Sequence, residues 1–100
     1  EINLTFAPYW DFLSKDVADA NLKTKRYPGH AQEFETAFAL AVFPENVRHD
    51  AMQEQEDKEP LEATAEAGAA MIESIVENTT QFIAGMIDGT NVEEIPAFHP

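Results

Sequence analysis

The sequence predicts an α/β fold to which this chain contributes one strand and two principal helices. Residues 2–6 alternate apolar and polar side chains, which is the period of a β-strand with two unlike faces. The i, i+3, i+4, i+7 spacing of an amphipathic helix recurs at Phe34, Ala37, Phe38 and Ala41. A broad apolar stripe then runs through residues 60–88 in steps of four and three, which predicts a long helix with a continuous buried face.

The strand predicted at residues 2–6 cannot be self-sufficient. A lone strand leaves unpaired N–H and C=O groups along both edges, so other sequence or a partner chain must supply the rest of the sheet. The broad apolar stripe in residues 60–88 also points to such an outside layer, because it suits a helix packed against a sheet or between subunits. We therefore expect most of the sheet to be encoded outside residues 1–100.

Composition and charge limit the possible functions. The chain has 100 residues, 44% of them apolar and 25% charged, which suits one segment of a single globular domain. Because cysteine is absent, disulfides and thiol chemistry are excluded. The net charge is −13, which makes nucleic acid a poor partner. No apolar run approaches the roughly 18 residues of a membrane span and no signal-peptide pattern occurs, so we expect a cytoplasmic protein without membrane contact.

Candidate chemistry and buried packing meet around His30. A Pro-Gly pair interrupts the preceding segment, and the helix predicted over residues 29–43 ends before Pro44. His30 then lies in the first helical turn beside free backbone N–H groups, and Glu33 follows one turn later. A lone histidine at a helix start usually caps or packs, whereas a catalytic histidine uses its change of protonation near neutral pH.

Three sequence motifs resemble those of a known family. They are Tyr9-Trp10-Asp11-Phe12, the segment His30–Ala37 with Phe43–Val47 behind it, and Ala63–Gly68 at the opening of the last helix. In this order they are similar to the Tyr-Trp-Asp-Phe, His-Ala/Gly-Gly-x-x-Glu-Thr-Ser with Pro-Glu-Leu-Val, and Ala-Ser-x-Glu-Lys-Gly motifs of the creatininase (creatinine amidohydrolase) family. Gln32, Ala37 and Ala67 depart from the family's usual glycine, serine and lysine.

The resemblance implies the C-terminal part of a layered α/β/α amidohydrolase. Such enzymes use a dinuclear zinc or manganese centre, where a bridged water attacks a cyclic or linear amide carbon. The family's metal ligands lie upstream of the part matched here, in a Glu-x-His segment, an aspartate and a His-Gly-His-x-Glu-Asn motif. The resemblance thus implies no metal ligand in this chain and an upstream segment or partner chain that completes the sheet and metal site. It also implies a homo-oligomer and a small-molecule amide substrate.

Candidate site residues follow from these motifs. By the resemblance, His30 handles a proton in the substrate pocket and Trp10 packs against a flat substrate ring; composition alone favours Trp10 as an apolar plug. The family's flap tryptophan is missing, and Tyr27 stands in that region as a ring that would replace it. Glu35 matches the Glu-Thr-Ser position and is expected in the pocket or as a partner that orients the histidine. Glu33 is expected to stabilise the helix N-terminus.

The remaining segments are expected to form a flap, a surface connection and a C-terminal tail. Residues 14–28 hold four of the six basic residues and are expected to form an exposed flap, as a loop or short helix. Residues 48–59 form an acidic surface connection, where His49 and nearby carboxylates lack the constrained spacing of a metal site. The tail, residues 89–100, is expected to wrap over a neighbour or to fray.

Two non-enzymatic functions stay open. One is a non-catalytic or processed subunit that lends packing to an assembly, which the missing ligands, Ala37, Ala67 and the altered flap favour. The other is a small acidic interaction domain, unrelated to the family, that folds alone. The enzyme hypothesis predicts amide hydrolysis only when the upstream segment is present.

Overall fold

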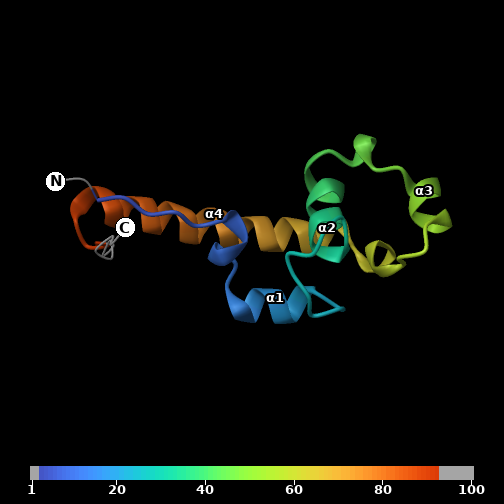
Figure 1. Ribbon diagram of the computed structural model, residues 1–100, viewed down its shortest axis with the longest axis horizontal. Coiled ribbons are helices and arrows are strands. Elements are labelled where there is room, and N and C mark those ends of the chain that lie inside the picture. Colours follow the sequence, from blue (N-terminus) through green and yellow to red (C-terminus); the bar gives the residue numbers. More distant parts are fainter. Residues whose placement is uncertain (1–2, 93–100) are drawn as a thin grey trace, which may run out of the picture.

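The computed structural model describes residues 3–92, which are built from helices and connecting loops (Figure 1). The α-helices in this part of the chain are α1 (Lys15–Asn21), α2 (Glu33–Val42), α3 (His49–Glu54) and α4 (Ala65–Asp88). Short 3-10 helices are η1 (Tyr9–Phe12), η2 (Pro44–Asn46) and η3 (Glu59–Glu62). Residues 3–92 contain no β-strand, so this part of the molecule is helical.

The segment expected to be a strand, residues 2–6, is extended from residue 3 onward and runs along α4 (Figure 1). The side-chain Nδ2 of Asn3 donates a hydrogen bond to the carbonyl oxygen of Asn91 at 2.7 Å. Farther along, the ring centroids of Phe12 and Phe82 lie 5.2 Å apart. The segment therefore runs antiparallel to the C-terminal half of α4 and has no partner strand among the described residues.

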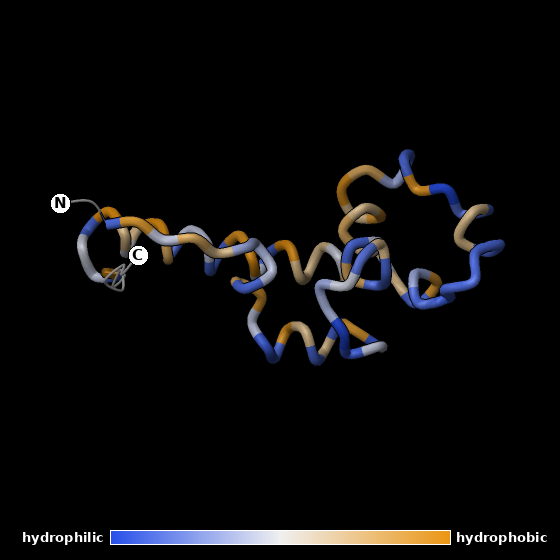
Figure 2. The backbone as a smooth tube through the Cα atoms, viewed as in Figure 1, coloured by the Kyte–Doolittle hydropathy of each residue, from blue (hydrophilic) through white to orange (hydrophobic). Residues whose placement is uncertain are grey.

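Apolar side chains remain exposed on both of these elements. Figure 2 shows the hydrophobic residues of the extended segment and of α4 along the same arm of the molecule. Leu4 and Phe6 are 64% and 89% exposed, and α4 exposes Val76, Ile83 and Ile87. The stripe expected of the long helix is therefore only half-buried in this half of α4, and the apolar residues expected to widen it there are exposed, because α1 and α2 pack against the other half.

The core lies where α1, α2 and the first half of α4 meet. Its buried apolar side chains are Leu13, Ala18, Leu22, Phe34, Ala37, Ala67, Met71 and Ile75. Helices α2 and α4 approach closely, since a Cβ atom on Gly68 would overlap the backbone carbonyl of Ala37. The radius of gyration, 16.9 Å, exceeds the value of about 13 Å for a compact domain of this length. The core is thus small for the length of the chain.

The predicted helices start later than expected. The motif helix, predicted over residues 29–43, corresponds to α2, which begins only at Glu33 because Ala31 has a left-handed φ of 52° that a helix cannot include. The expectation that His30 lies in the first helical turn is therefore wrong, since His30 lies in the loop before α2. The long helix, predicted over residues 60–88, is α4, whose first turn is capped by Thr64: its hydroxyl accepts a backbone N–H hydrogen bond at 3.1 Å. Its end agrees with the prediction, since Gly89 closes α4 with a φ of 85°.

One of the two connecting segments contains a helix that was not expected. Residues 14–28 form α1 and a loop, in line with the sequence, whereas residues 48–59 contain the short helix α3, which the sequence did not predict. Most of the tail expected at residues 89–100 lies outside the described residues. None of the described helices combines the length and apolarity that crossing a membrane requires.

Candidate functional site

The candidate site is built around residues 23–32, which we call the His30 loop. Its two ends are anchored in the core, because Leu22 before it is 1% exposed and Phe34 after it is fully buried. Between these anchors the backbone is left-handed at Lys25 and Ala31, with φ values of 61° and 52°. Residues other than glycine seldom adopt this conformation, so further contacts must hold the loop in shape.

Glu33 holds the beginning of the His30 loop. Its carboxylate oxygens accept hydrogen bonds from the backbone N–H groups of Lys23 and Thr24, at 2.9 and 2.8 Å. The residue is only 1% exposed, and a carboxylate withdrawn from water requires such donors. The expectation that Glu33 stabilises the helix N-terminus is therefore incomplete, because this residue also fixes the loop that precedes the helix.

Glu35 holds the other end of the same loop. Its Oε2 accepts a hydrogen bond from the backbone N–H of Ala31 at 2.5 Å. Glu33 and Glu35 both lie in the first turn of α2, and residues two apart on a helix point to different sides. Glu35 thus contacts the backbone next to His30, and no hydrogen bond within residues 3–92 joins it to the imidazole ring.

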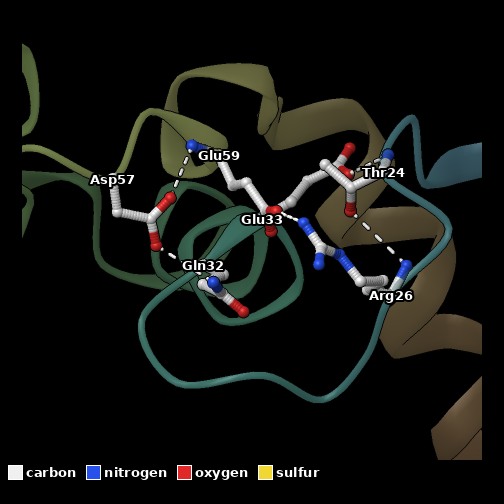
Figure 3. Close-up of polar contacts among 6 residues, drawn as sticks. All are labelled: Thr24, Arg26, Gln32, Glu33, Asp57 and Glu59. Carbon is white, nitrogen blue, oxygen red and sulfur yellow. Dashed lines mark hydrogen bonds and ion pairs between the residues drawn. The ribbon is translucent and has the colours of Figure 1, made fainter.

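Further polar contacts tie the His30 loop to the segment before α4 (Figure 3). The guanidinium of Arg26 forms an ion pair with Glu59, whose side chain is 18% exposed. Nε2 of Gln32 donates a hydrogen bond to Asp57 at 3.0 Å, and Asp57 also accepts one from the backbone N–H of Glu59 at 3.0 Å. The loop is therefore held by α2 on one side and by residues 57–59 on another.

His30 itself is exposed. Within residues 3–92, neither a hydrogen bond nor an ion pair engages its ring. The imidazole is therefore free on a backbone whose neighbouring residue, Ala31, is fixed by Glu35.

Trp10 and Tyr27 lie in one aromatic cluster around Phe34. Trp10 is half-buried, packs against the core and meets Tyr9 edge to face, with ring centroids 5.2 Å apart. Tyr9 stacks on Phe34 at 6.0 Å, and the ring of Tyr27 lies 5.6 Å from that of Phe34. Phe34 also contacts Phe38 at 4.7 Å. Trp10 and Tyr27 thus belong to the same cluster without a ring contact between them, because Tyr9 and Phe34 lie between the two rings.

Tyr9 connects the aromatic cluster with Glu35. Burial raises the pKa of the Tyr9 hydroxyl above its ordinary value of 10.0, and the negative charge of Glu35 raises this pKa further. The charge of Glu35 therefore acts on the hydroxyl of Tyr9 in addition to the hydrogen bond that Glu35 accepts from Ala31.

A cavity of about 380 Å³ lies between α2, η2, α3 and η3. It is lined mainly by small and apolar residues, with a few polar ones: Ala31, Glu35, Thr36, Ala39, Phe43, Asn46, Val47, Arg48, Ala51, Met52, Gln55 and Pro60. His30, Trp10 and Tyr27 are not among its lining residues. Of the four candidate site residues, only Glu35 therefore faces this cavity.

The described residues do not fit a metal centre. Across residues 3–92, no group of three or more His, Cys, Asp or Glu side chains is arranged to hold a metal ion. This part of the chain includes His49 and the acidic connection around it. The zinc or manganese pair implied by the resemblance therefore has no ligand set here.

Comparisons of this chain with protein families, with curated proteins and with solved structures return no match. The resemblance to the creatininase family rests on the three sequence motifs.

Sequence reasoning missed the contribution of Arg26 and Glu59 and understated that of Glu33. The first two are far apart in the chain, and no spacing rule pairs such charges. The position of Glu33 could have predicted that its carboxylate accepts backbone hydrogen bonds, since an acidic residue in the first turn of a helix often does so. The partners of that carboxylate, Lys23 and Thr24, could be found only from the structure.

Proposed function

We propose that this chain is the C-terminal part of a creatininase-family amidohydrolase, in which His30 transfers a proton during hydrolysis of a small amide. One observation carries the proposal: an exposed imidazole with a free ring stands on a loop that Glu33 and Glu35 hold at both ends. A proton-transfer group needs this combination, because its ring must be available to a substrate and its position must be fixed.

The extended backbone of residues 4–7 supports a layered protein whose sheet comes from elsewhere. In the described chain, the backbone of residues 4–7 makes no hydrogen bond, and Leu4 and Phe6 stay exposed. The exposed apolar side chains of α4 likewise need a covering layer. The proposal assigns both the sheet and the metal ligands to an upstream segment or partner chain, within a homo-oligomer.

The aromatic cluster supports a substrate with a flat amide-bearing ring. Trp10 is half-buried and Tyr27 is 37% exposed, so both rings offer surface beside the fully buried Phe34. Amide hydrolysis breaks a C–N bond and leaves a carboxylate and an amine, and the departing nitrogen must gain a proton. His30 is the residue proposed to supply it.

The test measures hydrolysis by the intact protein that contains this chain, supplied with Zn²⁺ or Mn²⁺. Cyclic imides, lactams and linear N-formyl amides are incubated with it, and the carboxylate and amine products are measured by mass spectrometry. His30→Ala should lower kcat by about 100-fold or more, the usual contribution of a general acid or base. His49→Ala, a matched change at the other exposed histidine of the described chain, should leave kcat unchanged. Equal activity of the two variants would remove His30 from the mechanism.

A non-catalytic subunit is the second candidate. It is favoured by the absence of a metal-ligand cluster within residues 3–92, and by the separation of His30, Trp10 and Tyr27 from the cavity beside α2. This candidate predicts no hydrolysis of any amide by the metal-loaded intact protein.

A further inference from the structure

We propose that Glu33 and Glu35 form a two-ended clasp on the His30 loop, and that Glu33 is a positioning residue for His30. The catalytic half of this proposal rests on the proposed function. The clasp itself rests on contacts within the described chain.

The geometry of α2 makes the clasp possible. The first turn of the helix places two carboxylates on different sides, and each reaches a different end of one loop. Glu33 reaches back to Lys23 and Thr24, whereas Glu35 reaches Ala31, the residue next to His30. A rigid helix thus fixes the separation between the ends of the loop that carries the imidazole.

Glu33 is the stronger half of the clasp. Both of its oxygens are engaged by backbone donors, and burial removes water as an alternative partner. A glutamine at this position would keep the size of the side chain but replace one acceptor oxygen with an NH₂ group. That group would face a backbone N–H, so donor would meet donor and one hydrogen bond would be lost.

The hydrogen bond from Gln32 to Asp57 and the ion pair between Arg26 and Glu59 attach the loop further, and the ion pair is weaker than the contacts of Glu33. The side chain of Arg26 is 68% exposed, so water and salt screen its attraction to Glu59. Loss of this pair should therefore loosen the middle of the loop without releasing its ends.

The backbone of the loop explains why a clasp is needed. Lys25 and Ala31 hold left-handed φ values that an unrestrained chain leaves readily. Once Glu33 no longer binds Lys23 and Thr24, Lys25 can return to an ordinary φ value, whereas Glu35 still holds Ala31. The part of the loop between Lys25 and Ala31, which carries His30, is then fixed at one end only.

Limited proteolysis of the intact protein with trypsin tests the clasp without reference to activity. Lys23, Lys25 and Arg26 are cleavage sites inside the loop, and the exposed Arg48 is a control site outside it. We expect Glu33→Gln to raise cleavage inside the loop by about tenfold and to leave cleavage at Arg48 unchanged, because proteolysis follows local opening.

Two further variants sharpen the comparison. Glu59→Gln should raise cleavage at Arg26 less than Glu33→Gln does, and Glu45→Gln, at an exposed carboxylate of η2, should change nothing. Unaltered cleavage in Glu33→Gln would overturn the clasp. An equal rise at Arg48 would also overturn it, since the effect would then be general unfolding.

Kinetics test whether Glu33 acts through His30. Glu33→Gln should lower kcat by about tenfold or more with little change in KM, because a misplaced proton-transfer group affects the reaction more than binding. In a protein that already carries His30→Ala, the same change should have no further effect on kcat. An equal loss in both backgrounds would show that Glu33 does not act through His30. If the native protein hydrolyses no amide, the proposed function and this positioning role fail together, and the trypsin result still decides the clasp.

Discussion

Gly68 of α4 lies against the backbone carbonyl of Ala37 in α2, with no room for a side chain between them. A Cβ atom on Gly68 would overlap that carbonyl and would also lie 3.1 Å from Cβ of Ala41. Because backbone cannot move aside as a flexible side chain can, the approach of the two helices depends on glycine at this position. The same approach fixes α2, and through α2 it fixes Glu33 and Glu35.

Gly68→Ala should therefore destabilise the fold. Overpacking of this kind typically costs about 1–3 kcal/mol, although alanine's higher helix propensity offsets part of it. The matched control is Ala69→Ser, at the exposed neighbouring position of α4, which should stay within about 0.5 kcal/mol of the native protein. Urea titrations of the intact protein, all at the same protein concentration, measure the free energy of unfolding of both variants. Equal stability of the two variants would be inconsistent with the close helix contact.

Gly89→Ala should destabilise the end of α4 by a different mechanism. Gly89 has a φ of 85°, and a Cβ added there would meet no heavy atom within 4 Å. The cost is thus purely conformational, about 1 kcal/mol for an alanine forced into the left-handed region. Gly89→Asn should cost less, because asparagine tolerates this conformation. A thermal melt in which alanine and asparagine behave alike would contradict this assignment.

Glu35→Gln should lower the pKa of Tyr9. Burial and the charge of Glu35 both raise this pKa above 10.0, so removal of the charge leaves the larger effect of burial in place. Since the pKa is raised in the folded protein, Tyr9 contributes stability below the unfolded value of about 10, and this contribution is lost as pH rises through the folded value. An NMR titration of the Tyr9 ring measures the shift. Glu45→Gln serves as the control, and an unchanged Tyr9 pKa in Glu35→Gln would refute the coupling.

Thr90→Val should raise the pKa of Asp88. The hydroxyl and the backbone N–H of Thr90 donate to Oδ1 of Asp88 at 2.5 and 2.8 Å, and these hydrogen bonds lower the pKa of Asp88 below 3.8. Asp88 therefore contributes stability above the unfolded pKa, and that contribution is lost as pH falls through the lower folded value. The Asp88 carboxyl is followed by NMR, with Thr80→Val as the control, because the Thr80 hydroxyl bonds within α4 to Val76. An unchanged or lower pKa of Asp88 in Thr90→Val would show that the hydroxyl does not act as described.

The sequence predicted the helices better than their starts. Apolar spacing is a local property, so the existence of α2 and α4 and the glycine that closes α4 could be read from the chain. The first residue of each helix depends on the conformation of a single neighbouring residue, which the spacing of apolar residues does not determine. Ala31 takes a left-handed φ, and Thr64 caps a backbone N–H of α4, so both helices begin later than predicted.

The polar contacts of the candidate site could not be predicted in the same way. Glu33 and Glu35 are both acidic residues of one helical turn, yet Glu33 is buried against a loop ten residues earlier and Glu35 binds the backbone four residues before it, and neither contact was predicted. Such roles are set by how the loop returns to the helix, which is a tertiary property. The segment expected to be a strand shows a second limit of sequence-based prediction. Alternating apolar and polar residues predict a strand, but the strand forms only where a neighbouring strand pairs with it.

Amide hydrogen exchange at Lys23 and Thr24 tests most directly whether Glu33 holds the loop that carries His30. In the native protein both amides should exchange slowly, because each donates to the buried carboxylate. Glu33→Gln should accelerate exchange at one or both sites by about tenfold or more while leaving the amide of Ile75, in the core of α4, unchanged. Exchange at Lys23 and Thr24 that is fast in the native protein, or identical in the two proteins, would contradict the account.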